Sequence, residues 1–284
     1  MKRSHSCALI TGAAGGIGSS VARRLAASGT NLLLTDLSAP PLDALATELR
    51  RTGIEITTIV ADITATAGRN AVVRKAQEQE VDVLINIAGV NPFGLFEKQT
   101  PAEIERALLI NASAPMLLCQ ALIPVLKERA EAHIVNLGST FGSIGFPGFC
   151  IYSASKFALR GFTEALRREL SNTSVRVHYV APRATRTALS TERVRAMNRE
   201  LKIGMDSPET VARVIERTLR RGRRATYLGL PERFFVLINS LAPGVVDRSL
   251  RRQLPVIQRY AAAARHPSDD TSRTPSTLQP LGAK

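Results

Sequence analysis

Short apolar runs alternate with longer stretches of helical periodicity over most of the chain. Several runs are continuously aliphatic, which is typical of strands that helices cover on both faces of a parallel sheet. The predicted strands are Cys7–Ile10, Asn31–Thr35, Ile54–Val60, Val81–Ile87, His133–Leu137, Val175–Val180 and Ala225–Leu228. The predicted helices are Ile17–Ser28, Leu42–Arg51, Gly68–Gln79, Pro101–Arg129, Ile151–Ser171 and Ser207–Arg220. This strict alternation predicts an α/β fold with one doubly wound parallel sheet.

Two segments differ from this pattern. The segment Arg183–Gly204 is polar with scattered apolar residues, and we predict a mobile loop over a site. Beyond the last predicted strand the composition changes to an apolar and basic stretch, and then to one rich in Pro, Ser and Thr. We therefore expect a domain of residues 1–230, a C-terminal extension of residues 231–264 and a disordered tail of residues 265–284.

The net charge of +14 comes from 31 arginines and 7 lysines against 24 acidic residues. A basic surface attracts nucleic acid, anionic lipid or acidic substrates, but an arginine-rich composition also arises from genomic bias, and both interpretations stay open. Much of the excess lies in residues 220–224 and 248–252, without the interleaved aromatic residues of a nucleic-acid platform. We therefore expect no specific nucleic-acid partner.

Cys7, Cys119 and Cys150 stand in apolar surroundings without CxxC spacing, and the four histidines are not clustered. This argues against a disulfide framework and against a metal site. Residues 1–6 lack the longer apolar region of a secretory signal, and no stretch approaches the roughly 20 apolar residues that span a bilayer. We expect a cytoplasmic protein.

A glycine-rich turn follows the first predicted strand and opens the first helix, with the sequence Thr11-Gly12-Ala13-Ala14-Gly15-Gly16-Ile17-Gly18. A pyrophosphate binds where the backbone N–H groups of a helix N-terminus are accessible and no Cβ atom blocks its approach. Such turns also occur for structural reasons, but the position between strand and helix favours a dinucleotide site.

The second predicted strand ends in Thr35-Asp36-Leu37. In a dinucleotide-binding fold, a carboxylate at this place hydrogen-bonds the adenosine ribose hydroxyls and repels a 2′-phosphate. No basic residue stands at Gly15 or Leu37 to bind that phosphate. An aspartate at this place also serves simply to end a strand. The residues favour NAD over NADP.

Tyr152 and Lys156 are four residues apart and fall on one face of a predicted helix. A phenol has a pKa near 10, and a neighbouring ammonium lowers that pKa toward the range useful for proton transfer. Ser139 follows the fifth predicted strand, at the edge of the sheet where ligands bind. Each feature alone also has a purely structural explanation, since a Ser beside a Gly is usually a turn.

In order and spacing, these motifs resemble the short-subunit branch of the short-chain dehydrogenase/reductase family, of the Tyr-x-x-x-Lys type, from about Cys7 to Gly229. The matching segments are the glycine turn, Asp62, Asn86-Ile87-Ala88-Gly89, Asn111, Ser139, Tyr152 with Lys156, and Pro182 to Thr187. The resemblance implies a Rossmann-type fold and an oxidoreductase that interconverts a secondary alcohol and a ketone.

The resemblance also implies a role for each matching residue. Tyr152 is expected to exchange the proton, Ser139 to polarise the carbonyl, and Asn111 to anchor a water in the proton relay. Lys156 is expected to hold the nicotinamide ribose and lower the tyrosine pKa. The remaining residues expected at the cofactor are Gly12, Gly16, Ile17, Gly18, Asp36 at the ribose, Asp62 at the adenine, Asn86, Ala88, Gly89, Val180, Pro182 and Thr187.

Two positions depart from the family pattern. Ile87 replaces the second asparagine of Asn-Asn-Ala-Gly, and Arg183 replaces the glycine that usually follows Pro182. Because that glycine lets the backbone approach the nicotinamide, Arg183 must point away or contact cofactor or substrate. A solvent-facing arginine and one that binds an anionic substrate group are both open interpretations.

The C-terminal extension carries Phe234, Phe235, Leu237, Ile238 and Leu241, with arginines following. Peripheral contact with a membrane interface and packing on the domain or a second subunit are the two hypotheses. The resemblance implies a homodimer or homotetramer through the helices near Pro101–Arg129 and Ile151–Ser171. A lipophilic or fatty-acyl-type substrate is favoured, and a non-catalytic NAD(H)-binding protein is the alternative from another class.

Overall fold

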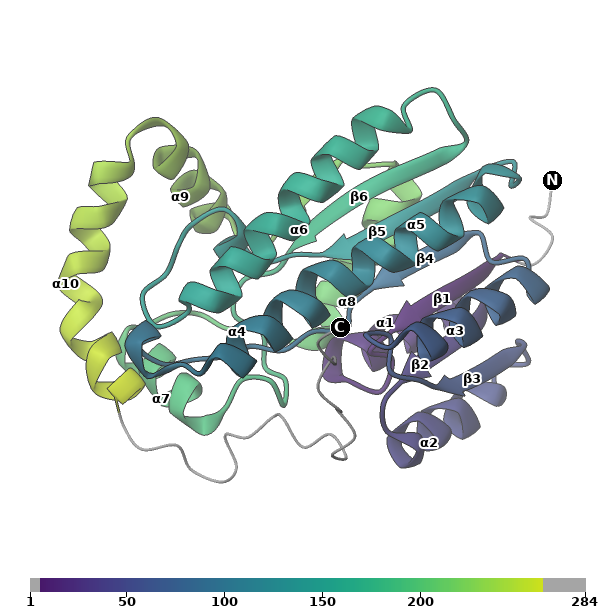
Figure 1. Ribbon diagram of the computed structural model, residues 1–284, viewed down its shortest axis with the longest axis horizontal. Coiled ribbons are helices and arrows are strands. Elements are labelled where there is room, and N and C mark those ends of the chain that lie inside the picture. The colour runs from purple at the N-terminus through teal and green to yellow at the C-terminus, as the bar shows by residue number, and fades with distance from the viewer. Residues whose placement is uncertain (1–5, 263–284) are drawn as a thin grey trace, which may run out of the picture.

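Seven parallel strands form one sheet in the order β3-β2-β1-β4-β5-β6-β7 in the computed structural model, which describes residues 6–262 (Figure 1). The strands are β1 (Cys7–Thr11), β2 (Asn31–Asp36), β3 (Ile56–Val60), β4 (Val83–Asn86), β5 (Ala132–Leu137), β6 (Val175–Ala181) and β7 (Ala225–Tyr227). The predicted fold class is confirmed, and each predicted strand overlaps an observed one. The tail predicted to be disordered, residues 265–284, lies outside the described residues.

Helices cover both faces of this sheet. They are α1 (Gly16–Ala27), α2 (Ala39–Arg50), α3 (Thr66–Glu78), α4 (Pro101–Leu108), α5 (Ala114–Lys127), α6 (Cys150–Glu169), α7 (Glu192–Glu200), α8 (Pro208–Arg221), α9 (Leu230–Leu241) and α10 (Pro243–Ala262). Short 3₁₀ turns occur at η1 (Phe96–Lys98) and η3 (Thr140–Gly142), and a π-helical turn, η2, at Leu109–Ser113.

Strand β1 shows how the apolar pattern builds the two layers. Ala8 and Ile10 pack on one face of the sheet with residues of α1, α2 and α8. Cys7 and Leu9 pack on the other face with residues of α3, α5 and α6. Because successive side chains of a strand point to opposite faces, a strand covered on both sides must be apolar throughout. All five residues of β1 are buried.

The order of the strands reverses at β1, which pairs with β2 on one side and β4 on the other. At such a switch point the loops after neighbouring strands run to opposite faces of the sheet and leave a crevice at the carboxyl ends. The glycine turn follows β1 directly, and Ile87-Ala88-Gly89 follows β4. The topology therefore brings these two segments to one crevice.

The long helix predicted at Pro101–Arg129 contains an irregularity. Its central turn, Leu109–Ser113, is π-helical, so the helix consists of α4, this turn and α5. Within residues 6–262, the run Pro101–Lys127 is the one helix with the length and composition of a membrane span, which differs from the sequence expectation. It is a core helix of the fold, since Leu118, Leu122 and Leu126 are fully buried against the sheet.

The segment Arg183–Gly204 was expected to be a loop throughout, and this is wrong for Glu192–Glu200, which forms α7. The Thr191 hydroxyl caps the helix by accepting from the Val194 N–H at 3.3 Å. Val194 and Met197 are buried three residues apart. The spacing of these apolar residues after a capping threonine is a helix signal that the polar composition of the segment concealed.

The C-terminal extension forms a helical hairpin of α9 and α10 at one end of the molecule, on the left in Figure 1. Helix α9 packs on α10, and α10 packs on α7. Ile257 and Ala261 of α10 are buried. The hairpin is thus attached to the domain at the far end of α10.

Candidate active site

The glycine turn after β1 fits closely against the segment after β4. Gly12 has a φ of +65°, and a Cβ atom there would lie 2.8 Å from the Ala88 Cα. A Cβ atom on Gly16 would meet Thr187 at 3.1 Å, and one on Gly18 would meet the Gly12 carbonyl oxygen at 2.1 Å. Gly12 and Gly18 therefore accept only glycine without a shift of the backbone, whereas a side chain at Gly16 would have to displace Thr187 by a few tenths of an ångström. They leave the N-terminus of α1 open in the way that a pyrophosphate requires.

Thr11 fixes the geometry of this turn. Its buried hydroxyl oxygen accepts the Ile87 and Ala88 N–H groups at 3.0 and 3.2 Å. The sequence analysis did not identify this role, because the two partners lie 76 and 77 residues further along the chain. The expected cofactor residues Gly12, Gly16, Ala88 and Thr187 are brought together here.

Asp36 ends β2 beside the same turn. Its carboxylate accepts the Ala14 N–H at 2.9 Å and the Leu37 N–H at 2.7 Å. Leu37 is half exposed and uncharged. A carboxylate held in this way presents negative charge at the end of β2, which suits ribose hydroxyls and disfavours a phosphate.

Asp62 and Asn86 follow the neighbouring strands. The Asp62 carboxylate accepts the Thr64 N–H at 2.8 Å and lies after β3 at one edge of the sheet. The buried Asn86 amide donates to the Asn136 Oδ1 atom at 2.9 Å and so links β4 to β5. Since β3 and β6 lie on opposite sides of β1, Asp36 and Asp62 face one half of the crevice and Pro182, after β6, faces the other.

Asn111 lies in the π-helical turn and is buried. Its side chain accepts the Val90 N–H at 2.8 Å and donates to the Val90 carbonyl at 2.8 Å. It also donates to the Ser155 hydroxyl at 3.0 Å. A Cβ atom on Gly89 would approach the Asn111 Oδ1 atom to 3.0 Å. Asn111 thereby links the segment after β4 to helix α6, at Ser155, which directly precedes Lys156.

Ser139 caps the short 3₁₀ turn after β5. Its Oγ atom accepts the Phe141 N–H at 3.1 Å, so the hydroxyl hydrogen stays available to donate. The Tyr179 hydroxyl donates to the Ser139 carbonyl at 3.2 Å and so fixes the backbone of Ser139. Tyr179 was absent from the predicted site. No local pattern indicated it, because Tyr179 stands in a strand that also holds Arg176 and His178.

Tyr152 and Lys156 lie one turn apart near the start of α6. The Lys156 Nζ atom is 5.8 Å from the centre of the Tyr152 ring and donates to the Leu137 carbonyl at 2.9 Å. Burial raises the pKa of Tyr152 to about 12, opposed by a hydrogen bond from Ser139. Burial lowers the pKa of Lys156 to about 8. The structure therefore brings Ser139, Tyr152 and Lys156 into one group.

This group can exchange a proton with a substrate oxygen. A phenol whose pKa is raised by desolvation responds strongly to any positive charge placed nearby, because the surroundings screen it little. The Lys156 ammonium and a positively charged ring bound in the crevice both lower the tyrosine pKa. Ser139 offers its hydroxyl hydrogen to the same oxygen.

Apolar side chains surround Tyr152. The rings of Phe141 and Phe149 both lie 6.4 Å from the Tyr152 ring. Phe149 belongs to a buried cluster whose other members come from the loops, α7 and α10: Phe93, Phe146, Val194, Met197, Ile257 and Ala261. The wall beside the tyrosine is thus built in part by the C-terminal extension.

Arg183 points to two carboxylates. Its guanidinium donates to the Asp206 carboxylate at 2.9 Å and to the Glu232 carboxylate at 3.3 Å. The Asp206 carboxylate, and to a lesser extent Glu232, raises the pKa of Arg183. The sequence left two interpretations of Arg183 open, a side chain that faces solvent and one that binds an anionic substrate group. The structure shows instead a side chain that binds two carboxylates of the chain. Arg183 attaches the first turn of α9 to the loop before α8.

Two surface hollows of about 270 and 370 Å³ lie elsewhere, along helix α8. Neither is lined by Ser139 or Tyr152. The chemistry therefore belongs to the crevice at the strand ends rather than to these hollows.

Comparison with known proteins gives a consistent picture. The family model described as short chain dehydrogenase matches residues 6–198. The chain is 32% identical to the oxidoreductase UcpA of Escherichia coli over 228 residues, which cover 79% of this chain and 84% of that protein. It is 30% identical to the human dehydrogenase/reductase SDR family member 4 over 218 residues, covering 73% and 78% of the two chains.

Solved structures with similar folds carry nicotinamide cofactors. A short-chain dehydrogenase from Sphingobium yanoikuyae in complex with NADPH is 31% identical, has a TM-score of 0.74 and covers 85% of this chain and 95% of its own. A bulky-bulky ketone specific alcohol dehydrogenase from Comamonas testosteroni is 29% identical, with a TM-score of 0.72 and coverage of 85% and 94%.

Proposed function

The chain belongs to the short-chain dehydrogenase/reductase family, and from this premise we propose that it interconverts a lipophilic secondary alcohol and its ketone with NAD(H). Membership of this family makes it a nicotinamide-dependent oxidoreductase. The observation that carries the proposal is the group of Ser139, Tyr152 and Lys156. It lies at the same strand ends as the glycine turn, where side chains larger than glycine would collide with neighbouring atoms.

Each residue of the group has one task in the proposed reaction. In the oxidising direction, Ser139 donates a hydrogen bond to the substrate oxygen, and Tyr152 accepts the hydroxyl proton. The ammonium of Lys156 stabilises the deprotonated phenol. The bound nicotinamide supplies the site that takes up or returns the hydride. In the reducing direction Tyr152 gives the proton back to the carbonyl oxygen, so both directions use the same three residues.

Asn111 fixes the position of the helix that carries two members of this group. Its bonds to Val90 and Ser155 fix the distance between the segment after β4 and α6, which carries both Tyr152 and Lys156. We propose that Asn111 holds the water through which the proton leaves toward solvent. The π-helical turn supports this role, because such turns leave the regular helical hydrogen bonding incomplete at functional positions.

NAD is the proposed cofactor because of Asp36. The carboxylate sits beside the Ala14 N–H and is followed by the uncharged Leu37, so a 2′-phosphate would meet negative charge and no partner. Related structures carry NADPH as well as NAD, so the preference rests on this residue. Asp62, Asn86 and Pro182 complete the proposed cofactor site.

The lipophilic substrate is proposed from the wall beside Tyr152. Phe141 and Phe149 flank the tyrosine, and Phe149 packs in a cluster of buried apolar side chains. A similar protein is specific for bulky ketones, which supports a roomy apolar site. The alternative of a non-catalytic NAD(H)-binding protein has no observation in its favour, since Ser139, Tyr152 and Lys156 are all present.

A homodimer or homotetramer in the cytoplasm is part of the proposal. Leu117 of α5 and Phe157 of α6 are partly exposed on the helices that the family uses to pair subunits. All three cysteines are free thiols, which suits a reducing compartment. A lipophilic substrate also implies contact with the membrane in which such molecules dissolve.

A turnover screen with NAD⁺ and secondary alcohols of increasing chain length tests the proposal. We expect NADH formation that becomes more efficient as the chain lengthens, because each buried methylene adds about 0.8 kcal/mol of apolar burial. Absence of NADH formation with every alcohol, and of NADH consumption with the matching ketones, would refute the catalytic assignment. A rate that is independent of chain length would refute the lipophilic substrate alone.

A further inference from the structure

Helix α9 exposes most of its apolar side chains. Phe234, Leu237, Ile238 and Leu241 recur at the spacing of one helix face, and their exposed fractions are 63, 54, 38 and 77%. Phe235 and Val245 extend the patch at 45 and 56%. We call these six residues the α9 apolar face. A contiguous apolar surface of this kind marks a docking site, whereas single exposed apolar residues are ordinary.

The opposite side of α9 is held by polar contacts. Glu232 pairs with Arg183, and the Asn239 amide donates to the Ser143 carbonyl at 3.1 Å. These bonds fix the rotation of the helix about its axis. Because Glu232 and Asn239 bind the domain, the opposite side of α9, which carries the apolar face, points to solvent.

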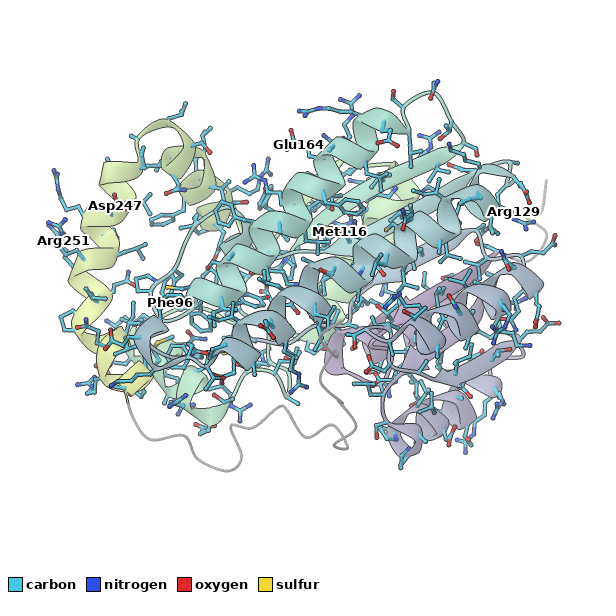
Figure 2. The ribbon with its side chains drawn as sticks, in the orientation of Figure 1. Phe96, Met116, Arg129, Glu164, Asp247 and Arg251 are labelled. Atoms are coloured by element: carbon cyan, nitrogen blue, oxygen red, sulfur yellow. The ribbon has the colours of Figure 1, made fainter. Side chains whose placement is uncertain are left out.

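Arginines accompany the apolar face. Residues 230–262 hold five arginines against one glutamate and one aspartate. The glutamate is neutralised by Arg183, and Arg259 pairs with Glu200. Among the described residues, Arg233, Arg248, Arg251 and Arg252 form no ion pair. Arg251 projects from the outer side of α10, away from the sheet (Figure 2).

From these observations we infer that the α9 apolar face docks on an anionic lipid surface. The hairpin holds both exposed aromatic and aliphatic side chains and arginines that form no ion pair, and interfacial helices combine these two features. A second copy of this chain would bring the same positive hairpin against itself. The excess of +14 over the whole chain acts in the same direction, since it draws the protein toward negative headgroups.

The position of the hairpin connects docking with the proposed function. Ser143, which α9 contacts, lies four residues after Ser139, and α10 contributes Ile257 and Ala261 to the wall beside Tyr152. Docking would bring the hairpin, which carries part of this wall, to the lipid in which an apolar substrate dissolves. This last step rests on the proposed function, whereas docking itself does not.

Vesicle co-sedimentation of the full chain tests the inference. We expect binding to vesicles of phosphatidylcholine and phosphatidylserine, weaker binding to phosphatidylcholine alone, and loss of binding as salt rises. The variant Phe234→Gln, Leu241→Gln should bind at least about tenfold more weakly. Its matched control, Leu37→Gln with Val60→Gln, changes residues exposed by 48 and 53% at the other end of the sheet and should bind like the native chain.

A second pair of variants tests the charge. Arg251→Gln with Arg252→Gln should weaken binding to anionic vesicles by about fivefold for each arginine. Arg50→Gln with Arg51→Gln removes the same charge from the exposed end of α2 and should have a much smaller effect. Equal binding by all four variants would overturn the inference. So would a concentration-dependent change of mass in solution that Phe234→Gln with Leu241→Gln abolishes while no vesicles are bound.

These results are separable from the proposed function. Vesicle binding needs no turnover, and turnover on a water-soluble secondary alcohol needs no vesicles. Native vesicle binding without any NADH formation would refute the proposed function and leave docking in place. NADH formation without vesicle binding would refute docking and leave the proposed function in place.

Discussion

Helices α1 and α9 are both twelve residues long, both follow a glycine, and both carry apolar residues at helical spacing. In α1 those residues, Val21, Ala22, Leu25 and Ala26, are buried against the sheet and α8. In α9 none of residues 231–241 is buried. The same pattern thus has two outcomes, and the difference is whether the described residues supply a partner for the apolar face.

The difference also applies to function. Around α1 the buried positions and the glycine turn are determined by contacts within the chain, at distances of a few ångströms. Around α9, residues 6–262 leave the apolar face uncovered, and the proposed partner is a lipid surface. A substitution in the first region should change the fold or the cofactor site, whereas one in the second should change only an interaction.

The largest expected effect on stability comes from Gly18→Ala. The added Cβ atom would lie 2.1 Å from the Gly12 carbonyl, so α1 must shift away from the turn, at a cost of about 1–3 kcal/mol and with loss of NADH affinity. Urea unfolding and NADH titration measure the two effects.

Two controls sharpen this prediction. Gly161→Ala in α6 meets open space and should stabilise the protein by up to about 1 kcal/mol. Phe234→Gln on α9 should leave the free energy of unfolding within about 0.5 kcal/mol of the native value. A large destabilisation by Phe234→Gln would show that α9 is covered by the chain after all and would break the comparison.

Cofactor preference is the next largest effect. Asp36→Ala with Leu37→Arg removes the carboxylate and adds a cation, so the preference for NADH over NADPH should fall by about tenfold or more. Fluorescence titration with the two cofactors measures it. Tighter binding of NADPH by the native chain would contradict the role given to Asp36.

Arg183 attaches α9 to the loop before α8, and its substitution gives a smaller effect. Arg183→Met leaves Asp206 and Glu232 without their partner and should destabilise the protein by about 1–2 kcal/mol. A double-mutant cycle with Glu232→Gln should show a coupling of about 0.5–1 kcal/mol. Additive effects in that cycle would mean that the pair does not hold α9.

The smallest expected effect is a pH dependence far from both regions. The buried His178 ring lies 3.0 Å from His133, and its pKa is lowered chiefly by burial, which disfavours the charged form. Its contribution to stability is therefore complete above about pH 6.5 and decreases as the pH falls toward the lowered folded-state value. The neighbouring His133 also lies 3.6 Å from Glu131.

The free energy of unfolding, obtained from urea titrations, should decrease between pH 7.5 and 5.5 by less than about 1.4 kcal/mol per pH unit. His178→Gln should flatten this slope. An unchanged slope in the variant would assign the pH dependence to other groups.

Much of the fold follows from the sequence because the strands are continuously apolar. Each run of β1, β2 and β5 is fully or almost fully buried, so its pattern has one explanation. The π-helical turn at Asn111 did not follow, since Asn111 bonds to distant segments, and α7 did not follow because its polar composition concealed the local helix signal. The partners of Arg183 lie 23 and 49 residues away, and no local pattern indicates them.

The candidate site shows the same limit. The order of motifs and the family resemblance placed Ser139, Tyr152 and Lys156 together, but the support from Thr11 and Tyr179 came only from the structure. Thr11 falls in the glycine turn and Tyr179 in a predicted strand, and neither position indicates which distant group the hydroxyl contacts.

The central claim is that Tyr152 transfers the proton. Its most direct test measures NADH affinity and turnover on one alcohol for Tyr152→Phe, beside Tyr260→Phe, which removes a surface hydroxyl bonded to Glu200. We predict that Tyr152→Phe keeps its NADH affinity and loses turnover by about 10²–10⁴-fold, while Tyr260→Phe retains both. Near-native turnover by Tyr152→Phe would contradict the account.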